Sequence, residues 1–439
     1  MKVAVIGGGL AGLTAAAYLS ESNRVEGVLY ERSPHLGGRA FTYEKNGFIL
    51  NYGAHAIYGM DRHDLSDIAQ ELGLTFESRE VDKRKVMYAK GGRLISAPLN
   101  FVNLLKTDLL TATQKVRFVG EITSIIAQLH KMKNYPTLGD FLRESKADEE
   151  IKELWVHLVC SNFFLSPEDA CQVPGPVISD YYHNLFLSRR PVNYILGSWS
   201  VITEQLKDKI ERSGRFQIRL KDPIESISLD GDRFLLRSKT NETAYDRVIL
   251  AMPLQQALRL LATTPWGPPL ASYEGNTPTE VLIYDLGLRE VVARPFAYIS
   301  DMDHKLFISD VSATDPSLVP QGGQLLQGVA YLTDRHGREE EYDRYLEDRQ
   351  EKMESLFDRY YPGWREAVVV KRVSKKAMVT SVKNVLGNEL LPITLPDVPF
   401  YFCGDGCAGK GELAERAFSS ARAAARLVLE EAQTPLPVR

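Results

Sequence analysis

The feature that most constrains the fold is the glycine-rich run Gly7-Gly8-Gly9-Leu10-Ala11-Gly12. It follows a short apolar run at 3–6, typical of a buried parallel strand, and precedes an alanine-rich segment at 14–20 that favours a helix. Gly7 allows a tight turn, Gly9 lets a pyrophosphate approach the backbone, and Gly12 permits close packing of helix on strand. The sequence therefore predicts a dinucleotide site with its phosphates at a helix N-terminus.

Glu31 completes this unit. It ends a second apolar run at 28–30 and lies 19 residues beyond Gly12 (31 minus 12). A carboxylate at the end of the second strand accepts hydrogen bonds from ribose hydroxyls, whereas the alternative is an ordinary surface acid. Strand, glycine turn, helix, strand and terminal acid within about 30 residues fit one βαβ unit.

Further motifs distinguish FAD from NAD. Glu31 is followed after five residues by Gly37-Gly38-Arg39, and an apolar run at 400–403 is followed by Gly404-Asp405. With the segment 245–253, these motifs resemble the flavin amine oxidase, phytoene desaturase and protoporphyrinogen oxidase superfamily. The resemblance is strong over 1–55, 245–253 and 400–425, and it implies FAD as cofactor.

The fingerprint and the resemblance together imply cofactor contacts spread over the whole chain. They are Gly7, Gly9, Leu10, Ala11, Gly12, Glu31, Arg32, Gly38, Arg39, Ala40, Gly53, Ala54, His55, Ile224, Gly404, Asp405, Glu412, Leu413 and Ala414. His55 is also the candidate catalytic residue, because a histidine beside the flavin could handle a substrate proton. A hydrogen-bonded structural histidine is the alternative.

The sequence departs from the amine oxidase branch at one position. That branch places a lysine near the flavin in the second domain, and the corresponding run at 277–284 offers Thr279 or Glu280 instead. The desaturase and porphyrinogen oxidase branches manage without this lysine, so the departure favours them. Lys410 is either a ligand contact or a solvated side chain.

The order of the predicted elements indicates an α/β protein built from discontinuous pieces. Sequence segments typical of a nucleotide-binding fold occur at both ends of the chain and in its middle. Other segments are inserted between them at two places. We expect a Rossmann-like FAD-binding domain from 1–98, 211–265 and 386–439. An inserted mixed α+β substrate-binding domain, partly helical, is expected from 99–210 and 266–385.

Composition narrows the function classes. A net charge of −4 gives no sign of a nucleic-acid partner. Cys403 and Cys407 form a single C-x3-C, which is short of a zinc ligand set, so no metal site is expected. Four cysteines suit a reducing cytoplasm.

No apolar run is long enough to span a membrane. The apolar segment 99–129 is expected to form a pair of helices that face the core. Peripheral contact with a membrane is the alternative.

These features predict an FAD-dependent oxidoreductase that moves a hydride from a largely apolar or conjugated small molecule to the flavin. An aromatic set in the helical insertion forms either its pocket or its core: Trp155, Phe163, Phe164, Tyr181, Tyr182, Phe186, Tyr194 and Trp199. Flavin amine oxidation is the first alternative. A flavin-free binding protein of the guanine-nucleotide dissociation inhibitor type is a remote one. The substrate, the electron acceptor (oxygen, quinone or protein) and the oligomeric state stay open.

Overall fold

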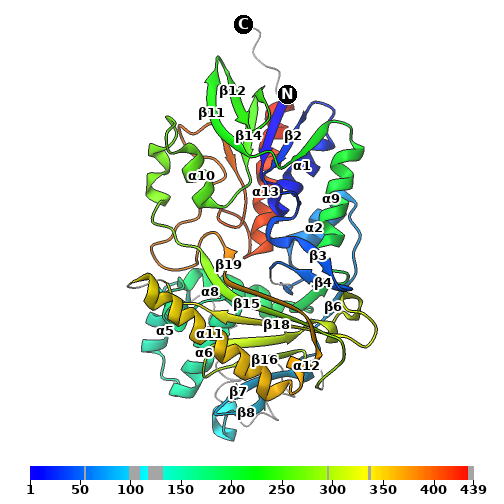
Figure 1. The fold of residues 1–439 in the computed structure, drawn as a ribbon. Helices are drawn as coiled ribbons and strands as arrows, with labels where there is room; N and C mark the ends of the chain where they lie inside the picture. Colours follow the sequence, from blue (N-terminus) through cyan, green and yellow to red (C-terminus); the bar gives the residue numbers. More distant parts are fainter. Residues whose placement is uncertain (54–55, 98–108, 117–131, 294–295, 335–337, 434–439) are drawn as a thin grey trace.

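The computed structural model describes residues 1–53, 56–97, 109–116, 132–293, 296–334 and 338–433. These residues form two units, one above the other in Figure 1, with the N-terminus at the top. The upper unit is built on a parallel sheet and the lower one on a largely antiparallel sheet. This confirms the predicted α/β class.

The parallel sheet of the upper unit takes its strands from distant parts of the chain. Its spatial order is β10 (Phe216–Leu220), β2 (Glu26–Glu31), β1 (Lys2–Ile6), β14 (Arg247–Leu250) and β20 (Tyr401–Phe402). The central strand β1 is apolar because both faces are covered. Val3 and Val5 belong to the core on one face, and Ala4 and Ile6 to the core on the other.

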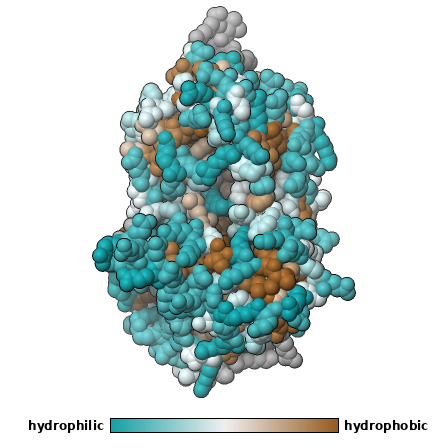
Figure 2. All heavy atoms as spheres, in the orientation of Figure 1, coloured by the Kyte–Doolittle hydropathy of each residue, from teal (hydrophilic) through white to brown (hydrophobic). Residues whose placement is uncertain are grey.

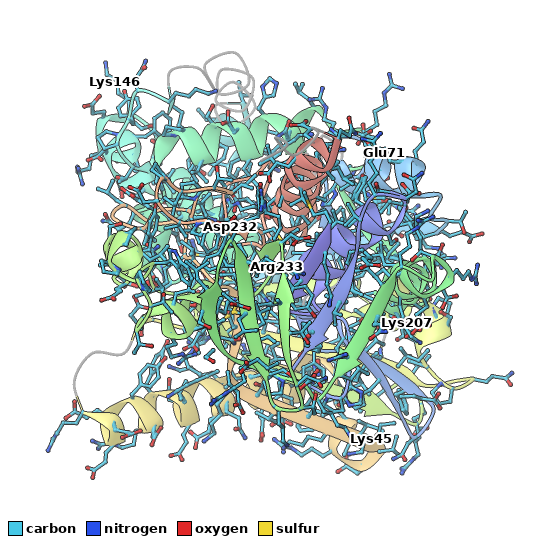
Figure 3. All side chains as sticks on the ribbon, turned by 90° about the horizontal axis from the view of Figure 1, so that it is seen from above. Lys45, Glu71, Lys146, Lys207, Asp232 and Arg233 are labelled. Atoms are coloured by element: carbon cyan, nitrogen blue, oxygen red, sulfur yellow. The ribbon has the colours of Figure 1, made fainter. Side chains whose placement is uncertain are left out.

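Helices cover one face of this sheet, and a small antiparallel sheet with one helix covers the other. The helices of the first face are α1 (Leu10–Ser20), α2 (Asp64–Leu72), α9 (Ser200–Arg212) and α13 (Ala414–Gln433). The second face packs against β11 (Ile224–Asp230), β12 (Arg233–Ser238), β13 (Glu242–Tyr245) and α10 (Leu254–Leu261). Viewed from above, the β11–β12 turn at Asp232 and Arg233 faces the reader, while Lys45, Lys146 and Lys207 lie at the periphery (Figure 3).

The lower unit is a seven-stranded sheet with a helix on one face and a helical layer on the other. Its order is β19 (Val368–Thr380), β15 (Thr279–Leu288), β18 (Gln324–Tyr331), β17 (Leu306–Asp310), β16 (Tyr298–Asp301), β7 (Val86–Lys90) and β8 (Arg93–Ser96). The helix α11 (Glu339–Tyr360) and the short α12 (Trp364–Ala367) pack on one face. The other face carries α5 (Leu138–Glu144), α6 (Glu149–Phe163), α7 (Pro167–Cys171) and α8 (Gly175–Leu187).

Two small sheets join the units: the hairpin β3 (Thr42–Lys45) and β4 (Phe48–Asn51), and the set β5 (Ala56–Tyr58), β9 (Val192–Ile195) and β6 (Ser78–Glu80). Two segments lie in a different unit from the one to which the predicted domain boundaries, at residues 98 and 210, assign them. The hairpin of β7 and β8 was placed with the first domain, yet β7 pairs with β16 in the lower unit. Helix α9 was placed in the second domain, yet it packs in the upper unit.

A buried ion pair links the lower sheet to the β3–β4 hairpin. Arg372 on β19 pairs with Asp285 on β15 and donates a 2.7 Å hydrogen bond to the carbonyl of Asn51. Asp285, which is 3% exposed, also accepts a 3.0 Å hydrogen bond from Gln327. Burial raises the pKa of Asp285, and the arginine opposes that rise.

We expect Arg372→Met to lower the free energy of unfolding by about 3–5 kcal/mol, because it leaves the buried carboxylate of Asp285 without its counter-ion. The exposed pair of Arg212 with Asp208 provides the control, and Arg212→Met should cost less than about 1 kcal/mol. Urea unfolding of both variants measures the difference. Equal losses would show that the buried pair is not needed for stability.

Candidate functional site

A cavity of about 1100 Å³ lies between the two units, at the carboxyl ends of the upper parallel strands. Figure 2 shows the face of the molecule hollowed at this level. In sheets of this kind, ligands bind in the crevice outside the carboxyl ends of the strands. The fold therefore offers one long cavity with the glycine turn at its wall.

The glycine turn is open toward this cavity. Gly9 begins α1 as its N-cap residue, without a side-chain hydrogen bond to the helix. A Cβ added to Gly9 would meet no protein atom within 4 Å, whereas one added to Gly12 would lie 1.8 Å from the carbonyl oxygen of Gly7. Gly9 thus lines the cavity, and Gly12 lies behind the turn and allows helix and strand to pack closely.

Glu31 is held beside the turn. Its carboxylate accepts 2.7 Å hydrogen bonds from the backbone N–H groups of Gly8 and Ser33. These bonds fix the side chain at the end of β2, where it lines the cavity together with Arg32 and Ile224. The remaining lone pairs of a carboxylate can accept ribose hydroxyls.

Arg39 and Asp405 meet in the middle of the cavity wall. Arg39 Nη1 donates to Asp405 Oδ2 at 2.6 Å and to the carbonyl of Val379 at 2.8 Å. Asp405 also accepts a 2.7 Å bond from the N–H of Ser381. Although burial opposes it, the guanidinium of Arg39 holds the pKa of Asp405 below its usual range. Resemblance had implied that both residues touch the cofactor. They line the cavity, but their charges are paired with each other.

The end of the large cavity that is formed by the lower unit is apolar. Phe164 comes from the end of α6, Val281 and Ile283 from β15, Val329 from β18 and Met378 from β19. Gln327 lines the same part. A planar, largely apolar ring system fits such a lining.

The strand residues expected in place of the missing lysine do not line the large cavity. Thr279 and Glu280 are absent from the described cavity lining, where Val281 and Ile283 stand instead. Glu280 contributes to raising the pKa of Tyr342 on α11, which packs on the other face of the sheet. No lysine lines the described part of the cavity wall.

Most predicted cofactor contacts lie together on the wall of this cavity. They are Gly7, Gly9, Leu10, Ala11, Glu31, Arg32, Gly38, Arg39, Ala40, Gly53, Ile224, Gly404, Asp405, Leu413 and Ala414. Gly12 is behind the wall. Ala54 and His55, including the candidate proton-handling group, lie outside the described residues.

Glu412 lies elsewhere. Its carboxylate pairs with Arg416 and accepts a 2.6 Å bond from Asn384, and it lines a second cavity of about 420 Å³. Glu412 is not among the described residues that line the large cavity, and its contact with the cofactor stays a prediction. Lys410 also lines the second cavity, where it donates to Asp64 at 2.9 Å.

Sequence reasoning missed several residues of the large cavity, among them Arg259, Gln256, Met378 and Val379. Of the aromatic set, Phe164 and Trp199 line the large cavity and Tyr181 the second one. Trp155 and Tyr182 are buried in the lower core instead. The continuous apolar run at 281–284 on β15 was the available signal for a buried strand that holds Val281 and Ile283.

Comparison with known proteins agrees with this geometry. The family described as flavin containing amine oxidoreductase matches residues 10–429. The chain belongs to this family, and its cofactor is FAD. The residues of the cavity fit that group: a glycine cradle, a carboxylate at one end and an apolar chamber at the other.

Individual relatives are similar over different lengths. An uncharacterized protein of Methanocaldococcus jannaschii is 43% identical over 94% of this chain and 95% of its own. Coproporphyrinogen III oxidase of Bacillus subtilis is 27% identical, but over only 35% of this chain and 34% of its own length. The crystal structure of an oxidoreductase from Methanosarcina mazei superposes with a TM-score of 0.77 at 20% identity, covering 98% of this chain and 100% of that one.

We expect Gly9→Ala to keep the fold and weaken FAD binding at least about tenfold. Its φ of −76° and ψ of −175° suit alanine, and the new methyl group would project into the space that a pyrophosphate needs. Flavin occupancy and the melting temperature of the purified protein measure the two effects. Gly275→Ala, also with open space around its Cβ, is the control. Full occupancy in Gly9→Ala would contradict this placement of the phosphates.

Glu415 gives a pH prediction. It lies at the start of α13, where burial raises its pKa from 4.5 to about 7, with Asp64, Lys410 and Glu412 as its charged neighbours. Because the folded pKa is the higher one, its contribution to stability is present below pH 4.5 and is lost as pH rises through 7. The loss amounts to roughly 3 kcal/mol.

Glu415→Gln should remove this loss. Urea unfolding free energies of both proteins, measured from pH 4.5 to 8, should diverge progressively, with the wild type losing more. Parallel curves would place the titration of Glu415 at its ordinary value.

Proposed function

We propose that this protein removes a hydride from a carbon of a largely apolar small molecule. The observation that carries the proposal is the apolar end of the large cavity, formed by Phe164, Val281, Ile283, Val329 and Met378. When bound, FAD supplies the hydride acceptor at N5. The chain itself supplies the cradle, the orientation and an environment that excludes water.

Each part of the wall then has a separate task. The free N–H groups at the start of α1 would hold the pyrophosphate, and Glu31 would hold a ribose. The start of α13, at Leu413 and Ala414, lies on the cavity wall, where its positive helix end would favour a negatively charged group by roughly 0.3–2 kcal/mol. The ion pair of Arg39 with Asp405 fixes these parts of the cavity wall relative to one another.

His55 is proposed as the residue that handles the substrate proton, with a purely structural histidine as the alternative. The chemistry requires that the substrate lose a proton together with the hydride, and a histidine titrates near neutral pH. The electron acceptor, whether oxygen, quinone or another protein, stays open. A cytoplasmic location is supported by four cysteines that are all free.

Neither a metal site nor a membrane span is part of the proposal. The described residues contain no cluster of three or more His, Cys, Asp or Glu that could hold a metal ion. None of the described helices combines the length and apolar composition needed to cross a bilayer. The segment expected to contact either core or membrane surface, 99–129, lies almost wholly outside the described residues.

Amine oxidation is the less favoured alternative. The described wall of the large cavity has no lysine, and the strand expected to carry one presents Val281 and Ile283. The likeness to coproporphyrinogen III oxidase covers about a third of each chain, so it supports the reaction class rather than that substrate. A flavin-free binding protein is disfavoured because the flavin family covers residues 10–429.

Anaerobic titration tests the proposal. We expect conjugated or apolar carbon donors to bleach the oxidised flavin band, while primary and secondary amines leave it unchanged. Hydrogen peroxide formed in air with an amine would support the alternative. A yellow protein that no carbon donor reduces would overturn the proposed reaction and leave the FAD assignment intact.

A further inference from the structure

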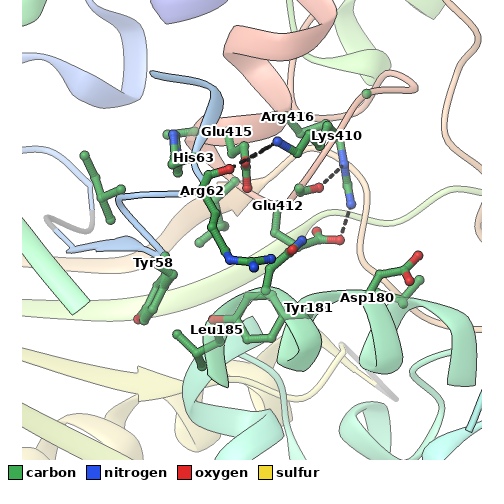
Figure 4. Close-up of a pocket in the computed structure, with 18 of the residues that line it drawn as sticks. Tyr58, Arg62, His63, Asp180, Tyr181, Leu185, Lys410, Glu412, Glu415 and Arg416 are labelled. Atoms are coloured by element: carbon green, nitrogen blue, oxygen red, sulfur yellow. Dashed lines mark hydrogen bonds and ion pairs between the residues drawn. The ribbon is translucent and has the colours of Figure 1, made fainter. Parts of the chain in front are cut away.

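The second cavity adjoins the first. It has a volume of about 420 Å³ and lies between β5, α8 and the loop that leads into α13 (Figure 4). Ala56, Leu413 and Ala414 line both cavities. A molecule bound in the second cavity therefore reaches the wall of the flavin site.

Part of the second cavity is apolar and aromatic. Tyr58 and Tyr181 face each other with ring centroids 6.1 Å apart, and Val177 and Leu185 add aliphatic surface from α8. Such a lining suits the hydrocarbon or aromatic body of a small molecule.

The acids around this cavity already have basic partners. Asp180 pairs with Lys133 at 2.8 Å, Glu412 pairs with Arg416, and Glu415 lies 3.9 Å from Lys410. Because burial raises the pKa of Glu415 to about 7, part of its population is neutral at physiological pH. His63 is neutral as well, since burial lowers its pKa to about 3.

Arg62 and Tyr181 each present to this cavity a hydrogen-bond donor that is unpaired among the described residues. Within the described part of the chain, the guanidinium of Arg62 has neither an acid partner nor a hydrogen bond, and Figure 4 shows it extending into the cavity toward Tyr181. The hydroxyl of Tyr181 is buried and has no partner among the described residues. A guanidinium binds a carboxylate through two parallel N–H bonds, and a phenol can donate a further one.

We propose that the second cavity binds a carboxylate on an apolar substrate, with Arg62 as its counter-ion and Tyr181 as an additional donor. The apolar body then extends past Leu413 toward the flavin cavity. This proposal rests on the proposed function, because the bound molecule is taken to be the one that is oxidised.

Binding of matched probes to the FAD-loaded protein tests the proposal. The probes are 4-phenylbutyrate, its neutral amide and the corresponding 4-phenylbutylamine, measured by calorimetry and by perturbation of the flavin band. We expect the carboxylate to bind at least tenfold more tightly than the amide. Arg62→Gln should abolish this preference, and Arg62→Lys should retain part of it.

Variants elsewhere locate the effect. Arg212→Gln, on the exposed surface of α9, should leave the preference unchanged, and Val177→Trp should block all three probes by filling the cavity. The proposal is overturned if amide and carboxylate bind equally to the wild type. It is also overturned if the amine binds most tightly, or if Arg62→Gln keeps the preference.

These outcomes are separable from the proposed reaction because binding needs no turnover. A carboxylate preference without flavin reduction by any carbon donor would contradict the reaction alone. Reduction by apolar donors without a carboxylate preference would contradict the second site alone.

Discussion

The ion pair of Arg39 with Asp405 is the interaction on which the site depends. It joins side chains 366 positions apart in the sequence. Through Val379 and Ser381, which bond to the same two side chains, it also ties the upper unit to the end of β19. A buried carboxylate is tolerated only when its acceptors are bonded, and these contacts supply that condition for Asp405. Gly38 and Gly404 are adjacent to the pair, so their backbone is held in place with it.

This pairing also determines the charge that a cofactor meets. Because Arg39 is neutralised by Asp405, it adds little net positive charge at the pyrophosphate. The attraction must come from elsewhere. We expect the backbone N–H groups at the uncapped start of α1 to supply it, together with Arg32 and Arg259 on the cavity wall. The glycine turn is consequently proposed as both the electrostatic and the steric centre of the phosphate site.

Local signals in the sequence predicted the parts of the fold that local chemistry determines. The apolar runs at 3–6 and 28–30 lie within β1 and β2, and the alanine-rich segment at 14–20 lies within α1, as the sequence predicts. Strand β19 was missed because its lysines and arginines conceal the pattern, and those charges suit a strand at the edge of a sheet. The pairing of β7 with β16 was missed for another reason, because no local pattern encodes a partner some 200 residues away.

The side-chain direction of Glu412 is another feature that the local sequence pattern does not predict. The resemblance placed it beside the cofactor with its neighbours Leu413 and Ala414. Leu413, however, takes a left-handed backbone with φ of 55°, a conformation that costs a non-glycine residue about 1–3 kcal/mol. The chain turns there, and Arg416, one helical turn later, binds the carboxylate of Glu412. The acid therefore faces the second cavity, while the positive end of α13 faces the first. The strain at Leu413 thus accompanies the chain reversal that turns the Glu412 carboxylate away from the wall of the large cavity.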